Sequence, residues 1–221
     1  MTIIEAIKAR HSVRQYQDLP IEEEKVTFIK DEMEKLSHES GLKFQLFTNE
    51  PEAFNGNEPH YGHFVACKNY MTISGPSAAA EACGYYGEQL VLFCQMLGLN
   101  TCWVALTFKK SAIKLDLAKG EKLLIVISLG YGVTPGMPHK SKRANQVSNI
   151  SDESPDWFKQ GVEAALLAPT AINQQQFYLE LIDDATVKAK AKIGPCNKID
   201  LGIVKYHFEV GADRDNFTWS A

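Results

Sequence analysis

The stretch from Ser77 to Leu97 most constrains what this chain can fold into. It is mostly apolar, carries Leu90, Phe93 and Cys94, and is followed by Gly98 at the position expected for a helix C-cap glycine. A helix with so little polar surface is stable only when other elements cover most of it. The sequence therefore predicts a helix in the core of the fold.

Shorter patterns predict the elements around this helix. Apolar residues spaced by three and four predict helices over 2–10 and 21–36, and further helices are expected from Ser154-Pro155 to Pro169 and around 201–208. Strands are predicted at 43–48, 69–74, 123–129 and 177–182. The polar loop over 55–62 is a candidate lid. This mixed order predicts an α+β fold.

Length and charge limit the organisation and the partners. The chain has 221 residues, of which 45% are hydrophobic, so it can bury one core. We expect a single domain over 1–221. Two similar lobes (1–150 and 151–221) are the alternative, because each half contains a helix, a polar turn and a strand. The net charge of −4 gives no basic excess for nucleic acid.

Cysteine spacing and hydropathy exclude other classes of protein. The five cysteines include no C-x-x-C pair, and no histidine pair has zinc-ligand spacing, so neither a metal site nor a disulfide framework is expected. No window approaches the roughly 18 consecutive apolar residues of a membrane-spanning helix. A reduced, cytoplasmic protein without a membrane partner fits this composition.

Two polar segments could recognise a ligand. Arg10-His11-Ser12-Val13-Arg14 places two guanidinium groups and a hydroxyl within five residues, which suits a phosphate, although such a run is more often a solvated helix end. Ala168-Pro169-Thr170-Ala171-Ile172-Asn173-Gln174-Gln175 supplies neutral donors and acceptors before a strand, and these also suit a polar turn that ends a helix.

Two further segments each allow both a ligand-binding and a purely structural interpretation. Leu97-Gly98-Leu99-Asn100-Thr101-Cys102-Trp103 is a small-residue turn whose backbone could approach a ligand, with Trp103 covering an aromatic ring or simply filling the core. The basic loop Lys140-Ser141-Lys142-Arg143 could add phosphate charge, but alone it is more typical of a solvated surface.

In combination the four segments resemble the FMN-dependent nitroreductase family. That family has an R-x-S-x-R segment after its first helix, an A-P-S-x-x-N-x-Q turn, an L-G-L-G-T-C-W-like turn, and a G-Y-P strand end before a basic loop. The chain matches with Arg10, Ser12 and Arg14; with Ala168, Pro169, Thr170, Asn173 and Gln175; with Leu97, Gly98, Leu99, Thr101, Cys102 and Trp103; and with Gly130 and Tyr131.

The chain departs from the usual motif order. The A-P-S-x-x-N segment normally lies in the first quarter of the chain, whereas here it arrives at residue 168. The chain is closer to a compact, rearranged branch that carries Gly84-Tyr85-Tyr86-Gly87-Glu88 and Asp200-Leu201-Gly202-Ile203. Gln176-Phe177 replaces Pro-Trp, and Gly132 replaces the proline after Gly-Tyr. These departures weaken inference about the substrate more than inference about the flavin.

The resemblance implies a nitroreductase-like fold, with a central, mostly antiparallel sheet flanked by helices, and an FMN site. Arg10, His11, Ser12 and Arg14 would hold the phosphate, with Lys142 or Arg143 adding charge. Pro169, Thr170, Ala171, Asn173 and Gln175 would line the ribityl chain and ring edge, and Trp103, Val104, Ala105 and Leu106 would lie along the ring. We expect no catalytic acid or base among the six histidines and name no catalytic residue, because the cofactor performs the redox step.

The resemblance also implies an activity and partners. We expect NAD(P)H to supply electrons to FMN and a small acceptor, such as a nitroaromatic or a quinone, to take them. The flavin site of the parent family lies at a homodimer interface, so a homodimer is expected, although a rearranged chain could supply both segments from one subunit. Two alternatives remain open: an FMN carrier or sensor without efficient turnover, and a protein of this fold that has lost flavin.

Overall fold

The computed structural model describes residues 1–55 and 62–220, so most of the loop considered as a lid (55–62) lies outside the described residues. The helices are α1 (Ile3–Ala9), α2 (Glu23–Ser40), α3 (Ala80–Met96), α4 (Ala144–Val147), α5 (Asp156–Ala165) and α6 (Asn197–Ala212). The strands are β1 (Lys43–Phe47), β2 (Asn69–Gly75), β3 (Asn100–Val104), β4 (Lys122–Gly130), β5 (Phe177–Leu181), β6 (Thr186–Ala191) and β7 (Thr218–Trp219).

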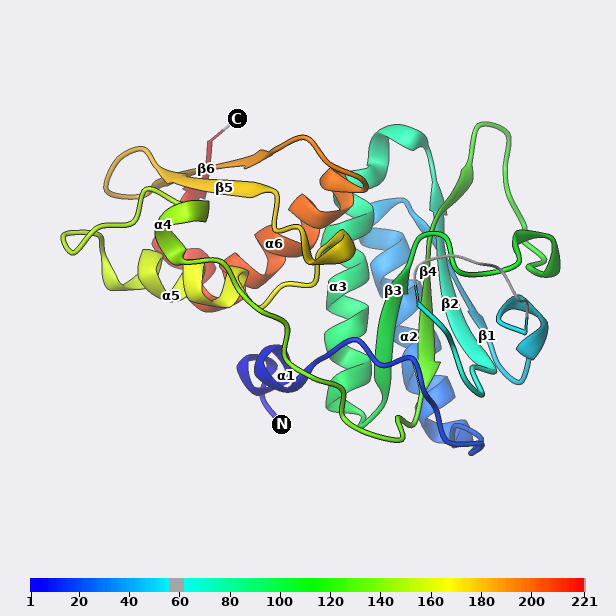
Figure 1. Cartoon of the computed structure of the whole chain (residues 1–221). Helices are drawn as coiled ribbons and strands as arrows, with labels where there is room; N and C mark the ends of the chain where they lie inside the picture. The colour runs from blue at the N-terminus through cyan, green and yellow to red at the C-terminus, as the bar shows by residue number, and fades with distance from the viewer. Residues whose placement is uncertain (56–61, 221) are drawn as a thin grey trace.

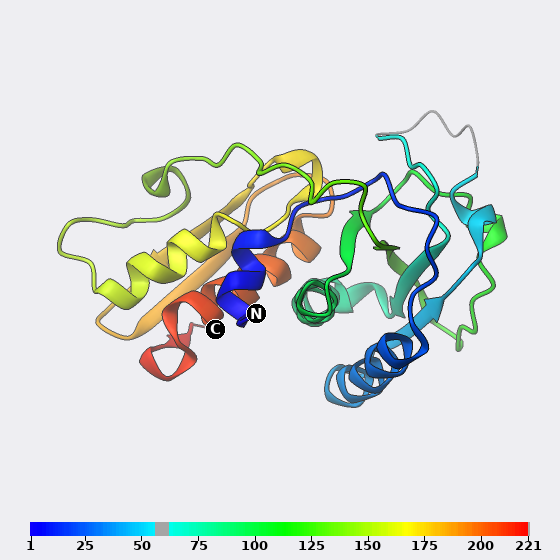
Figure 2. The same cartoon turned by 90° about the horizontal axis from the view of Figure 1, so that it is seen from below.

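The strands form two sheets that lie on either side of α3 (Figure 1), which is seen nearly end-on in Figure 2. The larger sheet has the order β1-β2-β4-β3, and all of its pairs are antiparallel. The smaller sheet has the order β5-β6-β7, in which β5 and β6 are antiparallel and β6 and β7 are parallel. Figure 1 shows the larger sheet with α2 on one side of α3, and the smaller sheet with α5 and α6 on the other. The predicted α+β, mostly antiparallel architecture is confirmed.

The two sides meet where α3 and α6 cross in close contact. A Cβ atom at Gly84 of α3 would lie 1.9 Å from the carbonyl oxygen of Ile199, and a Cβ atom at Gly202 of α6 would lie 1.9 Å from the carbonyl oxygen of Glu81. Any side chain at either glycine would therefore push the helices apart. The reciprocal pair fixes the beginning of α6 beside α3, and the cleft described below opens beside that beginning.

The central helix has the end that the sequence predicts. Helix α3 buries Leu90, Val91 and Cys94 completely, and Gly98 follows it with φ +79°, a conformation that favours glycine. The N–H of Gly98 donates to the carbonyl oxygen of Gln95 (3.0 Å). The prediction of a core helix stopped by this glycine is confirmed.

Other local predictions were incomplete or wrong. The segment interpreted as a turn (Leu97 to Trp103) is a turn only at its start, since residues from Asn100 onward pair with β4 as strand β3. Strands β6 and β7 were not predicted. The helix expected from Ser154-Pro155 begins at Asp156, and Ser154 does not cap it, since Pro155 is the N-cap and the Ser154 hydroxyl accepts from the N–H of Ser151 (3.0 Å). Within the described part of the chain, no helix combines the length and apolarity that crossing a membrane requires.

Candidate functional site

Two adjoining cavities form one cleft between the N-terminal segment, the start of α6 and the loop that follows α5. The first, of about 490 Å³, is lined mainly by polar residues, and the second, of about 320 Å³, is mainly apolar. Both are lined by Ser12, Arg14, Pro169, Thr170 and Ile172, so the cavities are continuous. A cleft with one polar and one apolar end suits an elongated ligand that carries both kinds of group.

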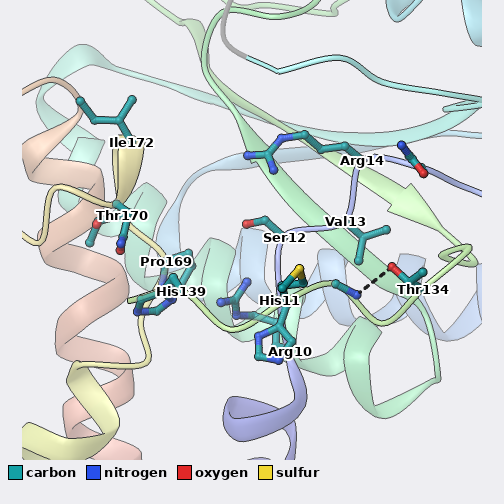
Figure 3. A pocket seen from close by; sticks show the side chains of 14 residues that line it. Arg10, His11, Ser12, Val13, Arg14, Thr134, His139, Pro169, Thr170 and Ile172 are labelled. Carbon is teal, nitrogen blue, oxygen red and sulfur yellow. Dashed lines mark hydrogen bonds between the residues drawn. The ribbon is translucent and has the colours of Figure 1, made fainter. Parts of the chain in front are cut away.

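Strand pairing holds segment 10–14 at the polar end. The N–H of Val13 donates to the carbonyl oxygen of Thr101 in β3 (3.0 Å), and the carbonyl oxygen of Arg14 accepts from the N–H of Val65 (2.9 Å). Extended backbone directs successive side chains to opposite sides. Figure 3 shows Ser12 and the guanidinium of Arg14 directed toward the cavity, facing Thr170 and Ile172.

The two arginines retain capacity for an anion. Among the described residues, neither the Nε of Arg10 nor the Nε of Arg14 has a hydrogen-bond partner, although both atoms are buried. Arg10 is only 3% exposed, and its Nε lies 3.6 Å from a carboxylate oxygen of Glu88. Desolvation, followed by the charge of Arg10, lowers the pKa of His11 at the same end of the cleft. The polar end is thus a positively charged site whose hydrogen-bond donors are not all used by the protein.

A strained loop forms the opposite wall. Ile172, Asn173 and Gln175 have positive φ angles of 48°, 54° and 45°, which are costly for residues other than glycine. Lys142 braces the loop by donating its Nζ to the carbonyl oxygens of Gln174 (2.8 Å) and Gln175 (2.9 Å). The surrounding contacts therefore hold this wall in a conformation that the local sequence alone would not favour.

Trp103 connects the apolar end to a buried carboxylate. It lies at the end of β3 and lines the apolar cavity together with Ile125, Ile199 and Ile203. Its Nε1 donates to Glu88 (2.9 Å), whose other oxygen lies 2.9 Å from the Nε2 of the fully buried His207. Glu88 therefore orients the indole at one end of the cleft and faces Arg10 at the other.

Asp200 also lines the apolar end. It lies in the first turn of α6 and is 5% exposed. Its carboxylate accepts from the N–H of Ala171 (3.1 Å to each oxygen) and from the amide of Gln174 (2.7 Å). Burial raises the pKa of Asp200 to about 6, and the Gln174 and Ala171 hydrogen bonds only partly offset this rise.

The structure brings most of the sequence-predicted site residues into this cleft. Those that line it are Arg10, His11, Ser12, Arg14, Trp103, Val104, Ala105, Leu106, Pro169, Thr170, Ala171 and Asn173. Three do not line either cavity. Lys142 is used to brace the loop, Arg143 is exposed at the start of α4, and Gln175 is buried with its amide bound to Lys140 and Asn173.

Sequence reasoning missed several residues of the cleft wall. These are Gln15, Val13, Thr134, Gly136, Met137, His139, Phe64, Thr107, Ile125, Ile172, Pro195, Cys196, Ile199, Asp200 and Ile203. Asp200 had a signal, since Asp200-Leu201-Gly202-Ile203 was noted as a motif without a role in the site. Val13 and Ile172 lie within the two polar segments, and Ile203 lies in the same motif as Asp200. The remaining residues carry no local signal, because only the packing of distant segments brings them to the cleft.

Comparisons of structure define the class of protein. A "putative nitroreductase" from Thermotoga maritima superposes with a TM-score of 0.69 at 22% identity, covering 97% of this chain and 85% of its own. A "putative nitroreductase in complex with FMN" from Desulfovibrio desulfuricans gives a TM-score of 0.51 at 18% identity, covering 70% and 99%. A "putative NADH dehydrogenase/NAD(P)H nitroreductase" from Bacteroides thetaiotaomicron gives 0.50 at 19% identity, covering 66% and 95%. The chain has the nitroreductase-like fold.

The sequence places the chain in a particular family. The profile of the family described as "Putative TM nitroreductase" matches residues 2–212, and the chain belongs to this family. No curated protein matches its sequence. The resemblance inferred from the four motifs is therefore confirmed at the level of fold and family.

Proposed function

We propose that this protein binds FMN in the cleft and uses it to transfer electrons from NAD(P)H to small acceptors such as nitroaromatics or quinones. The observation that carries the proposal is the continuity of a cationic polar end with an apolar end. A phosphate tail and an aromatic ring joined by a polyol chain require this order of surroundings. The names of the structural neighbours, which include an FMN complex and an NAD(P)H nitroreductase, agree with it.

The residues present fit the cofactor. The buried Nε atoms of Arg10 and Arg14, which lack partners among the described residues, are donors that a phosphate would satisfy. Ser12 and Thr170 add hydroxyl groups where the two ends join. Trp103 and the isoleucines of the apolar end give a flat, water-excluding surface that suits an aromatic ring.

The protein supplies binding, orientation and electrostatics for this chemistry. When bound, FMN supplies two-electron transfer between donor and acceptor. Arg10 and Arg14 would hold the phosphate, and the backbone from Trp103 to Leu106 would present N–H donors beside the ring. The amide of Asn173 donates to the carbonyl oxygen of Lys140 (2.9 Å) and accepts from Gln175 (2.8 Å), so its role would be to fix the loop rather than to contact the ring edge.

Assembly and location remain predictions. Residues from both motif segments line the cleft within one chain, which supports the alternative that one subunit supplies both segments. The expected homodimer is tested by light scattering coupled to size-exclusion chromatography, with and without FMN. The expected cytoplasmic location is tested by fractionation of the source cells.

The first experiment is an anaerobic absorbance titration. Purified protein reconstituted with FMN should show flavin bands that bleach after addition of NADH or NADPH. At about 100 times the dissociation constant, FMN should also stabilise the fold by roughly 2.7 kcal/mol in a melting experiment. Bands that persist with both nucleotides would instead support a carrier or sensor, and absence of binding would contradict the proposal.

A further inference from the structure

Asp200 is a buried carboxyl group in a cavity whose other walls are mainly apolar. We propose that Asp200 is the proton donor to an acceptor bound at the apolar end of the cleft, and that this acceptor belongs to the class of quinones or similar conjugated carbonyl compounds. The proposal rests on the function proposed above, and it adds the residue that completes the reduction.

Position distinguishes Asp200 from the other ionisable groups of the cleft. Of the described residues that line the apolar cavity, Asp200 alone carries a carboxyl group. Its neighbours Ile199 and Ile203, one residue before it and three residues after it on α6, line the same cavity. The groups that face this region are Cys196 at the start of the same helix, the amide of Gln174 and the N–H of Ala171 from the loop, and Arg14 from segment 10–14.

The hydrogen bonds leave one oxygen of Asp200 available to carry a proton. Among the described residues, Oδ2 accepts from both the Ala171 N–H and the Gln174 amide, whereas Oδ1 accepts from Ala171 alone. A carboxylate oxygen can accept two hydrogen bonds, so Oδ1 retains a free position. A proton on Oδ1 would keep the Gln174 contact intact, and the resulting O–H could donate to an acceptor in the cavity.

The acidity of the group suits proton donation at moderate pH. Burial raises the pKa of Asp200 to about 6, from an ordinary value of 3.8. At pH 6 about half of the molecules would carry the proton, whereas an exposed aspartate would be almost fully ionised. A general acid works best when its pKa lies near the operating pH.

The reduction of a quinone to a hydroquinone balances with this donor. FMN held in the cleft, once reduced by NAD(P)H, would supply a hydride equivalent, which gives the quinone two electrons and one proton. The second proton passes from Oδ1 of Asp200 to the quinone oxygen and leaves a carboxylate. Water then returns a proton to Asp200. An acceptor such as ferricyanide takes electrons without a proton and needs no such donor.

The test compares two acceptors in Asp200→Asn. In stopped-flow experiments with the FMN-loaded protein, bleaching by NADH should be unchanged within about twofold. Reoxidation by 1,4-benzoquinone should slow by about tenfold or more, since general acid catalysis typically contributes 10²-fold or more. Reoxidation by ferricyanide should be unchanged. Lys198→Ala, an exposed change in the same helical turn, is the matched control and should alter none of these rates.

Gln174→Ala provides a second variant that retains the carboxyl group. The Gln174 hydrogen bond lowers the pKa of Asp200, so its removal should move the decline of the benzoquinone rate with pH to higher pH. The same upward shift should appear in a carboxyl ¹³C NMR titration of the cofactor-free protein. A shift in neither measurement would overturn the proposal.

Other results distinguish this inference from the proposed function. Equal slowing of both acceptors in Asp200→Asn, together with weaker FMN binding, would show that Asp200 only positions the loop and would overturn the proton-donor role. An unchanged benzoquinone rate would also overturn it. If FMN binds to the wild type but NADH and NADPH fail to bleach it, the proposed oxidoreductase activity fails, and the carboxyl titration still tests the acidity of Asp200.

Discussion

Two buried glutamates bridge α3 and α6, and their surroundings differ. Glu88 of α3 accepts from Trp103 and faces His207 of α6, while Glu209 of α6 accepts from Trp219 (2.6 Å) and from Tyr85 of α3 (2.5 Å). Each glutamate thus pairs with a tryptophan on a strand and with a side chain of the opposite helix. The arrangement around the two carboxylates is closely similar.

The difference lies in the neighbouring cation. Arg10, beside Glu88, is 3% exposed, and its Nε lacks a hydrogen-bond partner among the residues described. The side chain of Arg214, beside Glu209, is 75% exposed to solvent. Another cavity, of about 410 Å³ and outside the cleft, lies next to Glu209. There Lys205 forms an ion pair with Glu81 (2.8 Å).

This comparison shows what distinguishes a ligand-binding site from a surface cavity whose charged groups already have partners. Around Glu209, the charged groups are paired with one another or solvated, so a ligand would have to compete with existing contacts. Around Arg10, a buried donor remains to be satisfied, and leaving it so costs free energy that a bound anion would recover. We therefore expect one FMN per chain, bound in the cleft beside Arg10.

The largest expected effect is that of Glu88→Ala on stability. The change would leave the fully buried His207 Nε2 and the partly buried Trp103 Nε1 without their acceptor and the buried Arg10 without its counter-ion, at a cost of about 3–5 kcal/mol. Glu209→Ala should cost less, because Tyr85 is only partly buried and Arg214 is largely exposed, whereas their counterparts His207 and Arg10 are buried. Urea unfolding of both variants measures the difference, and equal losses would show that the two carboxylates are equivalent.

The next effect concerns the affinity for FMN. Arg14→Ala removes a charged phosphate donor and should weaken FMN binding by about 1.5–3 kcal/mol, or roughly 10- to 150-fold. The affinity for riboflavin, which lacks the phosphate, should change by less than about twofold. Isothermal titration with both ligands makes the comparison, and Lys8→Ala on the exposed face of α1 is the control. Parallel losses for both ligands would place the phosphate elsewhere.

A smaller effect is expected in the pH dependence of stability. Because the folded-state pKa of Asp200 is raised from 3.8 to about 6, the folded protein retains a proton that the unfolded chain releases first. This group should therefore lower stability as the pH rises from about 4 to about 6. The stability of Asp200→Asn relative to the wild type should increase over that range in urea unfolding without cofactor. A constant difference between the two proteins would contradict the raised pKa.

The smallest effect should be that of Arg214→Ala. Its nitrogen lies 3.8 Å from Glu209 and its side chain is largely exposed, so the ion pair should contribute less than about 1 kcal/mol. FMN affinity and stoichiometry should both be unchanged. A second flavin bound by the wild type and lost in this variant would show that the cavity beside Glu209 is also a site.

The sequence by itself determined the core helix, most of the strands and the segments that form the cleft. Periodicity reports which residues need burial, and Gly98 marks the end of α3 because few other residues adopt its backbone conformation at low cost. The four motif segments together indicated the family. Twelve of the predicted residues line the cleft: four from the R-x-S-x-R segment, four from Trp103 to Leu106, and four from the A-P-T-x-x-N segment.

Only the tertiary structure decided how these groups are used. Lys142 is a cation in the sequence, but the carbonyl groups of the loop take up its ammonium group, so it lies outside the cleft lining. In the sequence, Asp200 looks like an ordinary acidic residue in the first turn of a helix. In the structure, the packing of α6 against the loop buries it beside the apolar cavity. The burial of a side chain and its hydrogen-bond partners depend on contacts between residues far apart in the chain, and the local sequence pattern does not encode these contacts.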